Sequence, residues 1–460
     1  MVLHCPRGDN VGRQKRQQSA HKLAGVVIDK RTLLAYALPA LPLAALTLPL
    51  YIIVPTYYSE TLGLPLATVA TVLAAVRVFD AAHDPVIGWL SDRYRPSFGR
   101  RRLFFLSSLP LTAVAAVMLF WPPAGAGAAW LAAWSALLSI GYAATLMPYY
   151  AWGAELAGDY RQRARVTAYR EVMTLIGTLV AIALPFSFGI SAEGSGLAVL
   201  GLAIAASLLV FGTFTVATVP EPREFTVARI GFGESLKRMA SNAPFVRLVA
   251  AFLVNGFSNS IPATLFLYFV SDRLGAPDLR GPMLFLFFAC GVAGVPVALW
   301  AAGRFGKHRA WCYAMLGSCF VFLFPPFVGS GDVTAFAVIC ALTGIGVGFD
   351  LALPAAIQAD VIDVDTASSG EQRSGIYFAA WSLTNKLALA LGVATTFPLL
   401  AWFGFVPGGS NEEPALFALA AVYAWLPVVL KLLAIGLMWN FPIDEVSSMR
   451  LRSAIEARTV

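Results

Sequence analysis

One stretch decides the fold of this chain: Arg77-Val-Phe-Asp80-Ala-Ala-His83-Asp84-Pro85-Val-Ile-Gly88-Trp-Leu-Ser-Asp92-Arg93. It lies in an apolar run long enough to cross a bilayer, yet it carries a cation, an imidazole and two carboxylates before it reaches Asp92. On a helix, Arg77, Asp80 and Asp84 fall at i, i+3 and i+7, so their side chains share one face. Ionisable groups inside a membrane are costly and by default mark an ion or substrate path.

Asp80 and Asp84 lie deep in the hydrocarbon layer that this run predicts. At about 1.5 Å per residue, Asp84 lies roughly 12 Å and Asp80 roughly 18 Å above Asp92, in a layer about 30 Å thick. Pro85 leaves one helical carbonyl without its usual donor, so a small cation could bind there between the carboxylates. The alternative is that Arg77 forms an ion pair with Asp80 or Asp84 that only holds helices together. One arginine, however, cannot neutralise both carboxylates.

The composition is that of a polytopic membrane protein, with 58% hydrophobic residues, 13% charged residues and a mean hydropathy of +0.71. The five cysteines form no CxxC pair, so neither a disulfide framework nor a zinc site is indicated. The net charge of +7 would suit nucleic acid, but the basic residues cluster beside apolar runs, where membrane topology accounts for them. The sequence has no metal-ligand cluster, nucleophile elbow or phosphate loop, so we expect neither an enzyme nor a cofactor.

Apolar runs predict about twelve membrane-spanning helices, and the charges between them predict the orientation. The basic loops and both termini fall on one side, which the positive-inside rule makes the cytoplasm of a plasma membrane, here a bacterial inner membrane. Residues 1-31 are polar and basic and have no cleavage site, so we expect a disordered cytoplasmic tail and not a signal peptide. The expected spans are 33-57, 65-90, 103-123, 128-152, 167-190, 197-219, 244-271, 281-303, 309-329, 333-359, 374-403 and 413-440.

The two halves of the chain carry similar charged motifs at corresponding positions. Gly99-Arg100-Arg101-Arg102 follows the second span, and Gly306-Lys307-His308-Arg309 follows the eighth. Twelve helices in two related halves are the architecture of an alternating-access transporter, so we expect an all-α membrane fold of two pseudo-symmetric six-helix halves. The predicted division is a tail at 1-31, a six-helix half at 32-219, a charged cytoplasmic linker at 220-243, a second six-helix half at 244-440 and a cytoplasmic tail at 441-460.

Several motifs together resemble one family. Gly88-x-x-x-Asp92-Arg93 followed by Gly99-Arg100-Arg101 is similar to a loop signature of the major facilitator superfamily. More narrowly, most of residues 33 to 440 resemble the glycoside-pentoside-hexuronide:cation symporter family, the melibiose-carrier group. The motifs that carry this resemblance are Arg77-x-x-Asp80-x-x-x-Asp84-Pro85-x-x-Gly88, Pro148-Tyr149-x-Ala-x-Gly-x-Glu155-Leu, Asp159-Tyr-x-x-Arg163, Ala359-Asp360-Val-Ile-Asp363 and Gly375-x-Tyr377-Phe378-Ala379-x-Trp381-Ser382-x-x-Asn385-Lys386.

The resemblance implies a coupling-cation site at Asp80 and Asp84, with Lys386 beside them and Arg77 on the same face. The residues agree, because Lys386 is a lone ammonium in an apolar run and needs an anionic partner; the alternative is that it snorkels to the interface. His83 stands where sodium-using relatives have an amide, and a histidine side chain can carry or relay a proton. We therefore expect H⁺ coupling in preference to Na⁺ at the two carboxylates, although serine, threonine or backbone oxygens could complete a sodium shell.

We expect the substrate to be a small polar organic solute, a sugar or glycoside. Melibiose-type members have acidic and polar side chains on the first and fourth helices, where this chain has Leu43, Ala44, Ala143 and Leu146. This departure leaves a second interpretation open, a cation-coupled carrier of an amphiphile such as a lysolipid. A transport-dead sensor on the same fold would be expected to lose the helix-two carboxylates, which this chain keeps.

Groups that stack on sugar rings or hold hydroxyls and carboxylates are candidates for substrate binding. For each aromatic candidate the alternative is helix packing or an interface belt. Asp350 stands in mid-span without a charged neighbour, so it is either a second protonatable group or the partner of Lys386 or Arg77. The candidates are Tyr149, Tyr150, Trp152, Arg170, Asn255, Asn259, Asp350 and Trp381.

Acidic and basic residues alternate at the predicted cytoplasmic helix ends. Ion pairs between them would close the inward mouth, and exposed pairs worth about 0 to 1 kcal/mol each suit a gate that must open. The alternative is topology signalling by the arginines alone, which does not require the interleaved acids. The expected gate residues are Asp92, Arg100, Arg101, Glu155, Asp159, Arg165, Asp360, Asp363 and Arg373. Nothing in the sequence indicates a protein partner.

Overall fold

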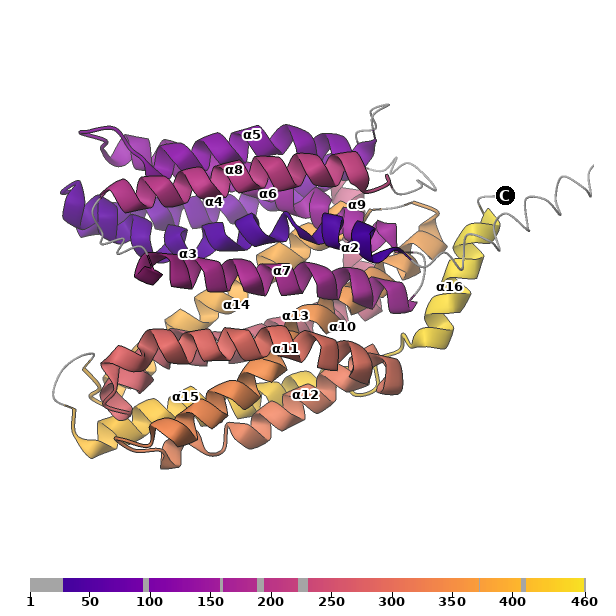
Figure 1. Ribbon diagram of the computed structural model, residues 1–460. Helices are drawn as coiled ribbons and strands as arrows, with labels where there is room; N and C mark the ends of the chain where they lie inside the picture. The colour runs from indigo at the N-terminus through magenta and orange to yellow at the C-terminus, as the bar shows by residue number, and fades with distance from the viewer. Residues whose placement is uncertain are drawn as a thin grey trace, which may run out of the picture.

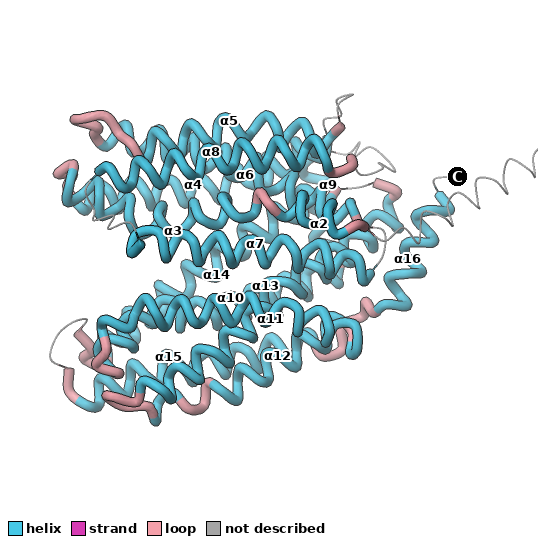
Figure 2. Tube along the Cα trace, viewed as in Figure 1, coloured by secondary structure: helices cyan, strands magenta, loops and turns pink. Residues whose placement is uncertain are grey.

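The computed structural model describes residues 28–93, 99–157, 160–187, 194–221, 231–371, 373–406 and 411–458. All regular secondary structure in these ranges is helical (Figure 2). The first half of the chain forms α2 (Lys30–Ala37), α3 (Ala40–Thr56), the π-helical turn η1 (Tyr57–Thr61), α4 (Leu66–Arg93), α5 (Arg100–Phe120), α6 (Ala128–Leu156), α7 (Tyr160–Ser187) and α8 (Gly194–Thr218). The second half forms α9 (Phe232–Ser241), α10 (Ala243–Tyr268), η2 (Phe269–Arg273), η3 (Pro277–Leu279), α11 (Arg280–Phe305), α12 (Lys307–Val321), η4 (Pro325–Phe327), α13 (Val333–Ser369), α14 (Ser374–Trp402), α15 (Glu413–Met438) and α16 (Glu445–Arg458).

The helices fall where the apolar runs predict them. Within the described ranges, nine helical segments are long and apolar enough to cross a membrane: α5, α6, α8 and α10 to α15. The other three predicted spans are occupied by α3, by α4 and by α7, and the last two carry ionisable residues such as Asp84 and Arg170. The expected all-α membrane architecture is confirmed, and these helices are consistent with twelve spans.

The division into tails, linker and halves stays a prediction. The helix α9 lies in the predicted linker, and α16 lies in the predicted C-terminal tail. The helix α2 begins at Lys30, inside the predicted N-terminal tail, whose residues 1–27 lie outside the described ranges.

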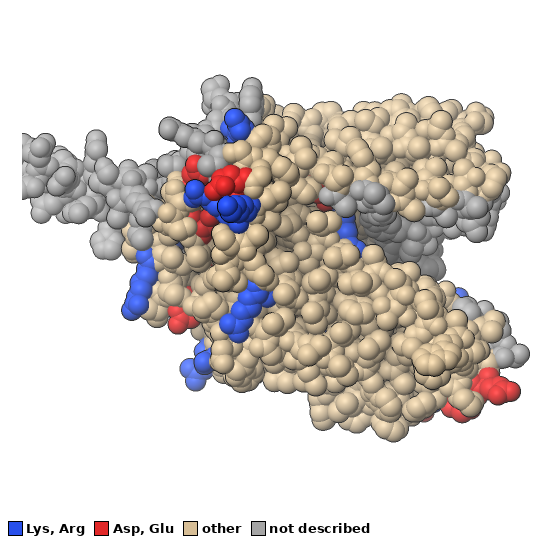
Figure 3. Space-filling view, turned by 180° about the vertical axis from the view of Figure 1, so that it is seen from behind, with Lys and Arg blue, Asp and Glu red and all other residues tan. Residues whose placement is uncertain are grey.

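Two bundles of helices lie side by side with their axes roughly parallel (Figure 1). One bundle contains α2 to α8 and the other α10 to α15; they touch where α4 and α6 meet α14, and where α7 meets α11 and α13. Charged side chains gather at the end that carries α9 and α16, and the flank seen in Figure 3 is almost free of charge. An uncharged flank is what a lipid-facing surface requires.

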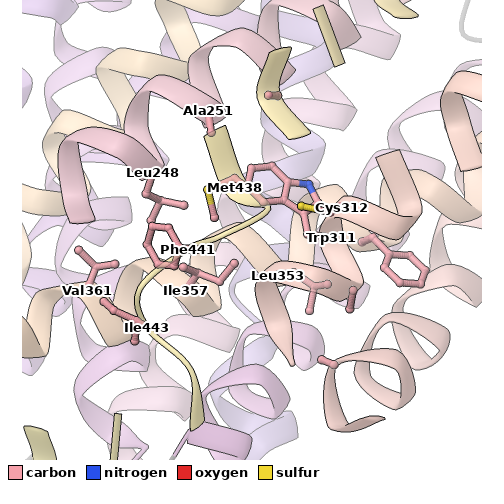
Figure 4. Close-up of a cluster of buried hydrophobic side chains, with 14 of the residues drawn as sticks. Leu248, Ala251, Trp311, Cys312, Leu353, Ile357, Val361, Met438, Phe441 and Ile443 are labelled. Carbon is pink, nitrogen blue, oxygen red and sulfur yellow. The ribbon is translucent and has the colours of Figure 1, made fainter. Parts of the chain in front are cut away.

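The core of the second bundle surrounds Trp311 of α12 (Figure 4). A buried indole N–H needs an acceptor, and Trp311 Nε1 donates to Asp350 Oδ1 at 2.6 Å. The apolar core therefore holds a buried carboxylate at its edge. The labelled side chains that pack in this core with Trp311 are Leu248, Ala251, Cys312, Leu353, Ile357, Val361, Met438, Phe441 and Ile443.

The helices α4 and α14 cross with their backbones almost in contact near the charged end. A Cβ atom added to Gly375 would lie 2.4 Å from the carbonyl oxygen of Gly88, and one added to Gly88 would lie 2.6 Å from that of Gly375. No side chain fits at such a distance, so this crossing requires glycine at both positions. Direct backbone packing thus joins the two bundles at this end.

Candidate ion and substrate site

Asp80 and Asp84 are both buried on α4, with 4% and 0% of their surface exposed. Lys386 reaches them from α14 in the other bundle, with its Nζ atom 2.7 Å from Asp84 Oδ2 and 3.4 Å from Asp80 Oδ2. Ser382, one turn before Lys386, donates to Asp84 Oδ2 at 3.1 Å. The structure therefore brings together the carboxylates and the lysine expected at the cation site. The side chain of Arg77 lies outside the described part of the structure.

His83 lies beside the carboxylates in a defined tautomer. Its Nδ1 atom lies 2.8 Å from the carbonyl oxygen of Phe79, which can only accept, so Nδ1 carries a hydrogen. In the neutral imidazole, Nε2 is then an acceptor, and it lies 3.7 Å from Asp84 Oδ1. Ser139 of α6 donates to Asp80 Oδ1, a contact that sequence reasoning missed, because serine on an apolar face gives no signal by itself.

Asp84 Oδ1 is buried and has no hydrogen-bond partner among the described residues. A buried carboxylate oxygen that no protein group donates to is one that a proton or a cation would stabilise. The atom that faces it, His83 Nε2, is itself an acceptor in the neutral imidazole. A proton or a cation arriving between these two atoms would satisfy both.

A cavity of about 240 Å³ opens beside the two carboxylates, between α3, α4, α6 and α14. Its charged wall consists of Asp80, Asp84 and Lys386, and much of the remaining wall is apolar, including Ala143 and Leu146. An ion at one wall and space for a solute beside it are what coupled binding requires. The other lining residues are Leu46, Thr47, Leu50, Leu73, Ala74, Val76, Ser135, Leu138, Ser139, Tyr142 and Ser382.

Tyr149 and Tyr150 line a second cavity, of about 110 Å³, and Leu43 and Ala44 form part of its wall. Arg170 lies behind it, with its Cζ atom 3.8 Å from the centre of the Tyr150 ring. The neighbouring Glu171 accepts from Arg170 Nη2 at 2.6 Å. Two aromatic candidates thus border this space, whereas Arg170 is occupied by a carboxylate.

Trp152 and Trp381 line neither cavity. Trp152 is fully buried, and its Nε1 atom donates to the carbonyl of Pro220 at 3.0 Å. Trp381 is stacked on Phe252, with ring centres 3.6 Å apart. In this conformation both side chains pack helices, which is the alternative that the sequence left open for them.

Asp350, Asn255 and Asn259 form a separate polar cluster in the second bundle with Lys431 of α15. Lys431 Nζ lies 3.4 Å from Asp350 Oδ2 and 2.8 Å from the side-chain oxygens of both asparagines. The asparagine amides donate to Asp350 at 3.1 and 2.9 Å. Of the alternatives left open for Asp350, a pair with Lys386 is not the one found, because Lys386 lies on the carboxylates of α4. Lys431 was missed, although a lone ammonium in an apolar run was the signal used for Lys386.

The hydrogen-bonding capacity of Asp350 and Lys431 is fully used within this cluster. Oδ1 of Asp350 accepts from Trp311 and Asn255, and Oδ2 accepts from Lys431 and Asn259. The three donors of Lys431 all have acceptors. Donors stabilise the ionised carboxylate. The arrangement therefore favours a permanent ion pair that ties α10, α12, α13 and α15 together.

At the charged end, Asp92, Arg100, Arg101 and Glu155 form one network, as expected for a gate. Arg101 lies 2.7 Å from Asp92 and 2.5 Å from Glu155, which also binds Arg100 at 3.0 Å. Asp92 further accepts from the first backbone N–H groups of α14, those of Gly375 and Ile376, at 2.8 and 3.0 Å. A carboxylate of the first bundle thus caps a helix of the second.

A second network joins the bundles directly. Arg163 of α7 binds Asp360 at 3.0 Å and Asp363 at 2.7 Å, both on α13. Lys307 also binds Asp360, at 2.5 Å, and Arg452 of α16 binds Asp363 at 2.9 Å. These pairs are buried, so the conformation described here is closed at its charged end.

Two of the expected gate residues, Arg165 and Arg373, form no ion pair between the bundles in the described part of the structure. Arg165 donates to Gln162 at 3.3 Å and binds no carboxylate among the described residues; residues two apart on a helix point in different directions, and Arg163 is the one that faces α13. Arg373 binds Asp365 at 2.5 Å and Glu371 at 3.4 Å, all within the second bundle. Asp159 lies outside the described residues. Sequence reasoning missed the gate role of Arg163, although this arginine belongs to one of the motifs that carry the family resemblance.

Replacing Arg163 with glutamine should open the charged end more often. Hydrogen bonds to charged groups contribute about 1.5 to 3 kcal/mol, so we expect at least a roughly tenfold gain in the open population. The measurement is the rate at which a membrane-impermeant maleimide labels a cysteine replacing Ile87, which packs below the gate against Ala143 and Ala379, in a cysteine-free background. Arg165→Gln is the matched control. Equal labelling rates for the two variants would contradict the assignment.

Comparison with known proteins agrees with this architecture. Residues 35–445 match the model of a family described as MFS/sugar transport protein. A glucuronide carrier protein homolog of Escherichia coli (strain K12) is 24% identical, over 85% of this chain and 87% of that protein. A sodium-dependent lysophosphatidylcholine symporter 1 of Mus musculus is 23% identical, over 84% of this chain and 80% of that protein.

A solved structure has the same fold. The E. coli fucose:proton symporter superposes with a TM-score of 0.64 at 14% identity, over 87% of this chain and 97% of that chain. The resemblance to cation symporters of the major facilitator superfamily is confirmed by the family match, which covers nearly the whole chain. This chain therefore belongs to the MFS/sugar transport protein family and is a multi-pass membrane transporter, not an enzyme.

Proposed function

We propose that this transporter carries a sugar or glycoside together with H⁺ by alternating access. The family description and the glucuronide carrier homolog support the substrate class. The basic loops support a plasma-membrane orientation, bacterial and inner, in which both termini and the charged end face the cytoplasm. The conformation closed at that end is then the outward-facing one.

The observation that carries the coupling proposal is the pair of facing acceptors, His83 Nε2 and Asp84 Oδ1, 3.7 Å apart. One proton added to either atom creates a donor for the other, and histidine is the residue type that most often relays protons in proteins. The rival ion, Na⁺, prefers oxygen ligands, which Asp80, Ser139 and Ser382 could supply around Asp84. A test of coupling therefore has to follow H⁺ and Na⁺ separately.

The coupling mechanism follows from where Lys386 lies. Its pairs with Asp80 and Asp84 join α14 of one bundle to α4 of the other, so they hold the empty transporter together at mid-membrane. Protonation of Asp84 removes the nearer of the two charges that Lys386 binds, leaves the longer pair with Asp80 and so weakens this link. Solute in the adjoining cavity would then supply contacts to both bundles, and the loaded transporter reorients with its buried charges neutralised.

A second candidate substrate is an amphiphile such as a lysolipid. The observation that favours it is the apolar wall formed by Ala143 and Leu146 in the larger cavity and by Leu43 and Ala44 in the smaller one. A relative named as a lysophosphatidylcholine symporter adds support. A competition panel of sugars against lysolipids separates the two candidates.

The test is solute-induced ion movement in proteoliposomes that contain a pH-sensitive dye, with a sodium gradient imposed separately. Sugars, glycosides, uronates and lysolipids are added one at a time. We expect a pH change evoked by a sugar or glycoside and insensitive to sodium. Sodium dependence without a pH change would overturn H⁺ coupling, and a response to lysolipids alone would overturn the sugar assignment.

A further inference from the structure

A further cavity, of about 180 Å³, lies at the charged end of the molecule, away from the ion site. There α7 of the first bundle runs beside α11 of the second, and α16 stands at their ends (Figure 1). The cavity is lined from both bundles, so it is complete only while this end is closed. Its lining residues are Arg161, Ala164, Arg165, Leu299, Ala302, Gly303, Lys307 and Glu445.

One wall of this cavity is basic. Arg165 is half-buried in it and meets no carboxylate among the described residues; its one hydrogen bond to them goes to the neutral Gln162, at 3.3 Å. Arg161 is paired with Glu445 at 2.7 Å, but the two side chains are 68% and 39% exposed, and such pairs are weak. Positive charge is therefore in excess here. The ion pairs at this junction, together with Arg165, set five cations against three carboxylates: Arg161, Arg163, Arg165, Lys307 and Arg452 against Asp360, Asp363 and Glu445.

The rest of the wall is apolar and lies at the level of the lipid headgroups. A Cβ atom added to Gly303 would meet no atom within 4 Å, so the cavity is open beside this glycine. Exposed aromatic side chains follow one another next to it, with neighbouring ring centres at most 6.4 Å apart. Exposed tryptophan and tyrosine are enriched where a membrane meets water, so this row marks that boundary. The row consists of Trp300, Phe305, Tyr313 and Trp439.

The ligand that fits this cavity is an anion with an apolar part. An apolar cavity of about 150 Å³ holds benzene, and a phosphate group is no larger than that ring, so the space of about 180 Å³ admits a phosphodiester. A soluble anion would use the arginines but leave the apolar wall uncovered. A zwitterionic headgroup brings its own cation, which Arg161 and Arg165 would repel. Basic pockets between helices at the cytoplasmic membrane surface are typical sites for anionic headgroups.

We propose that an anionic phospholipid binds in this cavity and stabilises the conformation closed at the charged end. Its phosphate binds Arg161 and Arg165 of α7, and the start of its acyl chain lies against Leu299 of α11. Because the two helices belong to different bundles, the site is lost when the bundles separate at this end. A ligand that binds one conformation only shifts the population towards it. The inference does not depend on the transported solute or on the coupling ion.

The experiment measures maleimide labelling of the cysteine that replaces Ile87, in lipid nanodiscs without solute or ion gradient. Nanodiscs of phosphatidylcholine are compared with nanodiscs of phosphatidylcholine and phosphatidylglycerol in equal parts. A ligand at about ten times its Kd that binds only the closed conformation favours it about tenfold, so we expect roughly tenfold slower labelling with phosphatidylglycerol. Equal rates in the two lipids would overturn the proposal. Equal slowing by soluble glycerol phosphate, added to phosphatidylcholine nanodiscs, would show that the site takes a soluble anion and would overturn it as well.

Two variants locate the lipid effect in this cavity. Gly303→Leu fills the space, and Arg165→Gln removes the charge that meets no carboxylate; each should remove most of the slowing by phosphatidylglycerol. The matched control is Gly436→Leu, the same substitution near the same end of α15, where an added Cβ atom also meets nothing within 4 Å. It should keep the slowing. A lipid effect that survives in both cavity variants, or that is lost equally in Gly436→Leu, would overturn the assignment.

These variants should act only where the anionic lipid is present. In phosphatidylcholine alone, Arg165→Gln should label at the rate of the unsubstituted transporter, because Arg165 joins no carboxylate of the other bundle among the described residues. That lipid is therefore the one in which Arg165→Gln serves as the control for Arg163→Gln. Faster labelling of Arg165→Gln in phosphatidylcholine would place Arg165 in the gate itself and contradict its assignment to the lipid.

Discussion

Asp84→Asn is expected to abolish concentrative uptake while the protein still binds its solute. Asparagine keeps the size of the side chain but cannot be protonated, and it removes the negative charge that lies 2.7 Å from Lys386. A carrier without its coupling ion can only equilibrate the solute, so the accumulation ratio should fall to about one. The measurement is uptake of a labelled sugar by proteoliposomes under an imposed ion gradient, beside counterflow without a gradient, which should persist.

The control for this variant is an aspartate-to-asparagine substitution at an exposed position for which we expect no role in ion coupling. Asp278 lies exposed in the short helix η3, far along the chain from the ion site, and Asp278→Asn should leave accumulation unchanged. Uphill uptake by Asp84→Asn would refute the coupling role of this carboxylate. Loss of counterflow together with uptake would point instead to a damaged fold.

The Asp350 and Lys431 pair is expected to show strong coupling in thermal unfolding. Removing one partner leaves an uncompensated buried charge, which typically costs about 3 to 5 kcal/mol, so Asp350→Asn and Lys431→Gln should each lower the melting temperature markedly. The double variant removes both charges and keeps groups that can hydrogen-bond with Asn255 and Asn259. We therefore expect it to be more stable than either single variant.

An exposed pair supplies the comparison. Arg238 and Glu234 lie 3.1 Å apart on α9 with side chains 44% and 46% exposed, and Glu234→Gln should cost less than about 1 kcal/mol. Additive effects of Asp350→Asn and Lys431→Gln would contradict the ion-pair clamp. A second protonatable role for Asp350 makes a different prediction, because Asp350→Asn would then change the pH dependence of uptake, whereas the ion-pair clamp predicts no such change.

The sequence shows where buried charge lies but not which charge it meets. Lys386 and Lys431 both read as lone ammonium groups in apolar runs, and Asp350 as a lone carboxylate. The partners on α4 and α14 are 302 residues apart, and those on α13 and α15 are 81 residues apart. The pairing depends on how each helix is rotated against its neighbours, a property that no local pattern contains.

The gate residues of α7 also show that a local sequence pattern does not reveal how a helix is rotated against its neighbours. The alternation of acids and arginines at helix ends was visible, and Asp92, Glu155, Asp360 and Asp363 all take part in it. The sequence placed Arg165 in the gate, whereas Arg163 is the arginine of α7 that binds carboxylates of α13, because packing between the bundles sets the face that α7 turns towards α13.

By itself, the sequence determined that this is an all-α membrane transporter with carboxylates in mid-membrane. The length of apolar runs and the cost of burying charge depend on composition and spacing alone. Only the tertiary structure decided that Asp84 Oδ1 faces His83, that Lys431 neutralises Asp350, and that a cavity opens beside the carboxylates of α4. Those features arise where helices distant in the sequence meet, and the rotation and spacing of packed helices decide them.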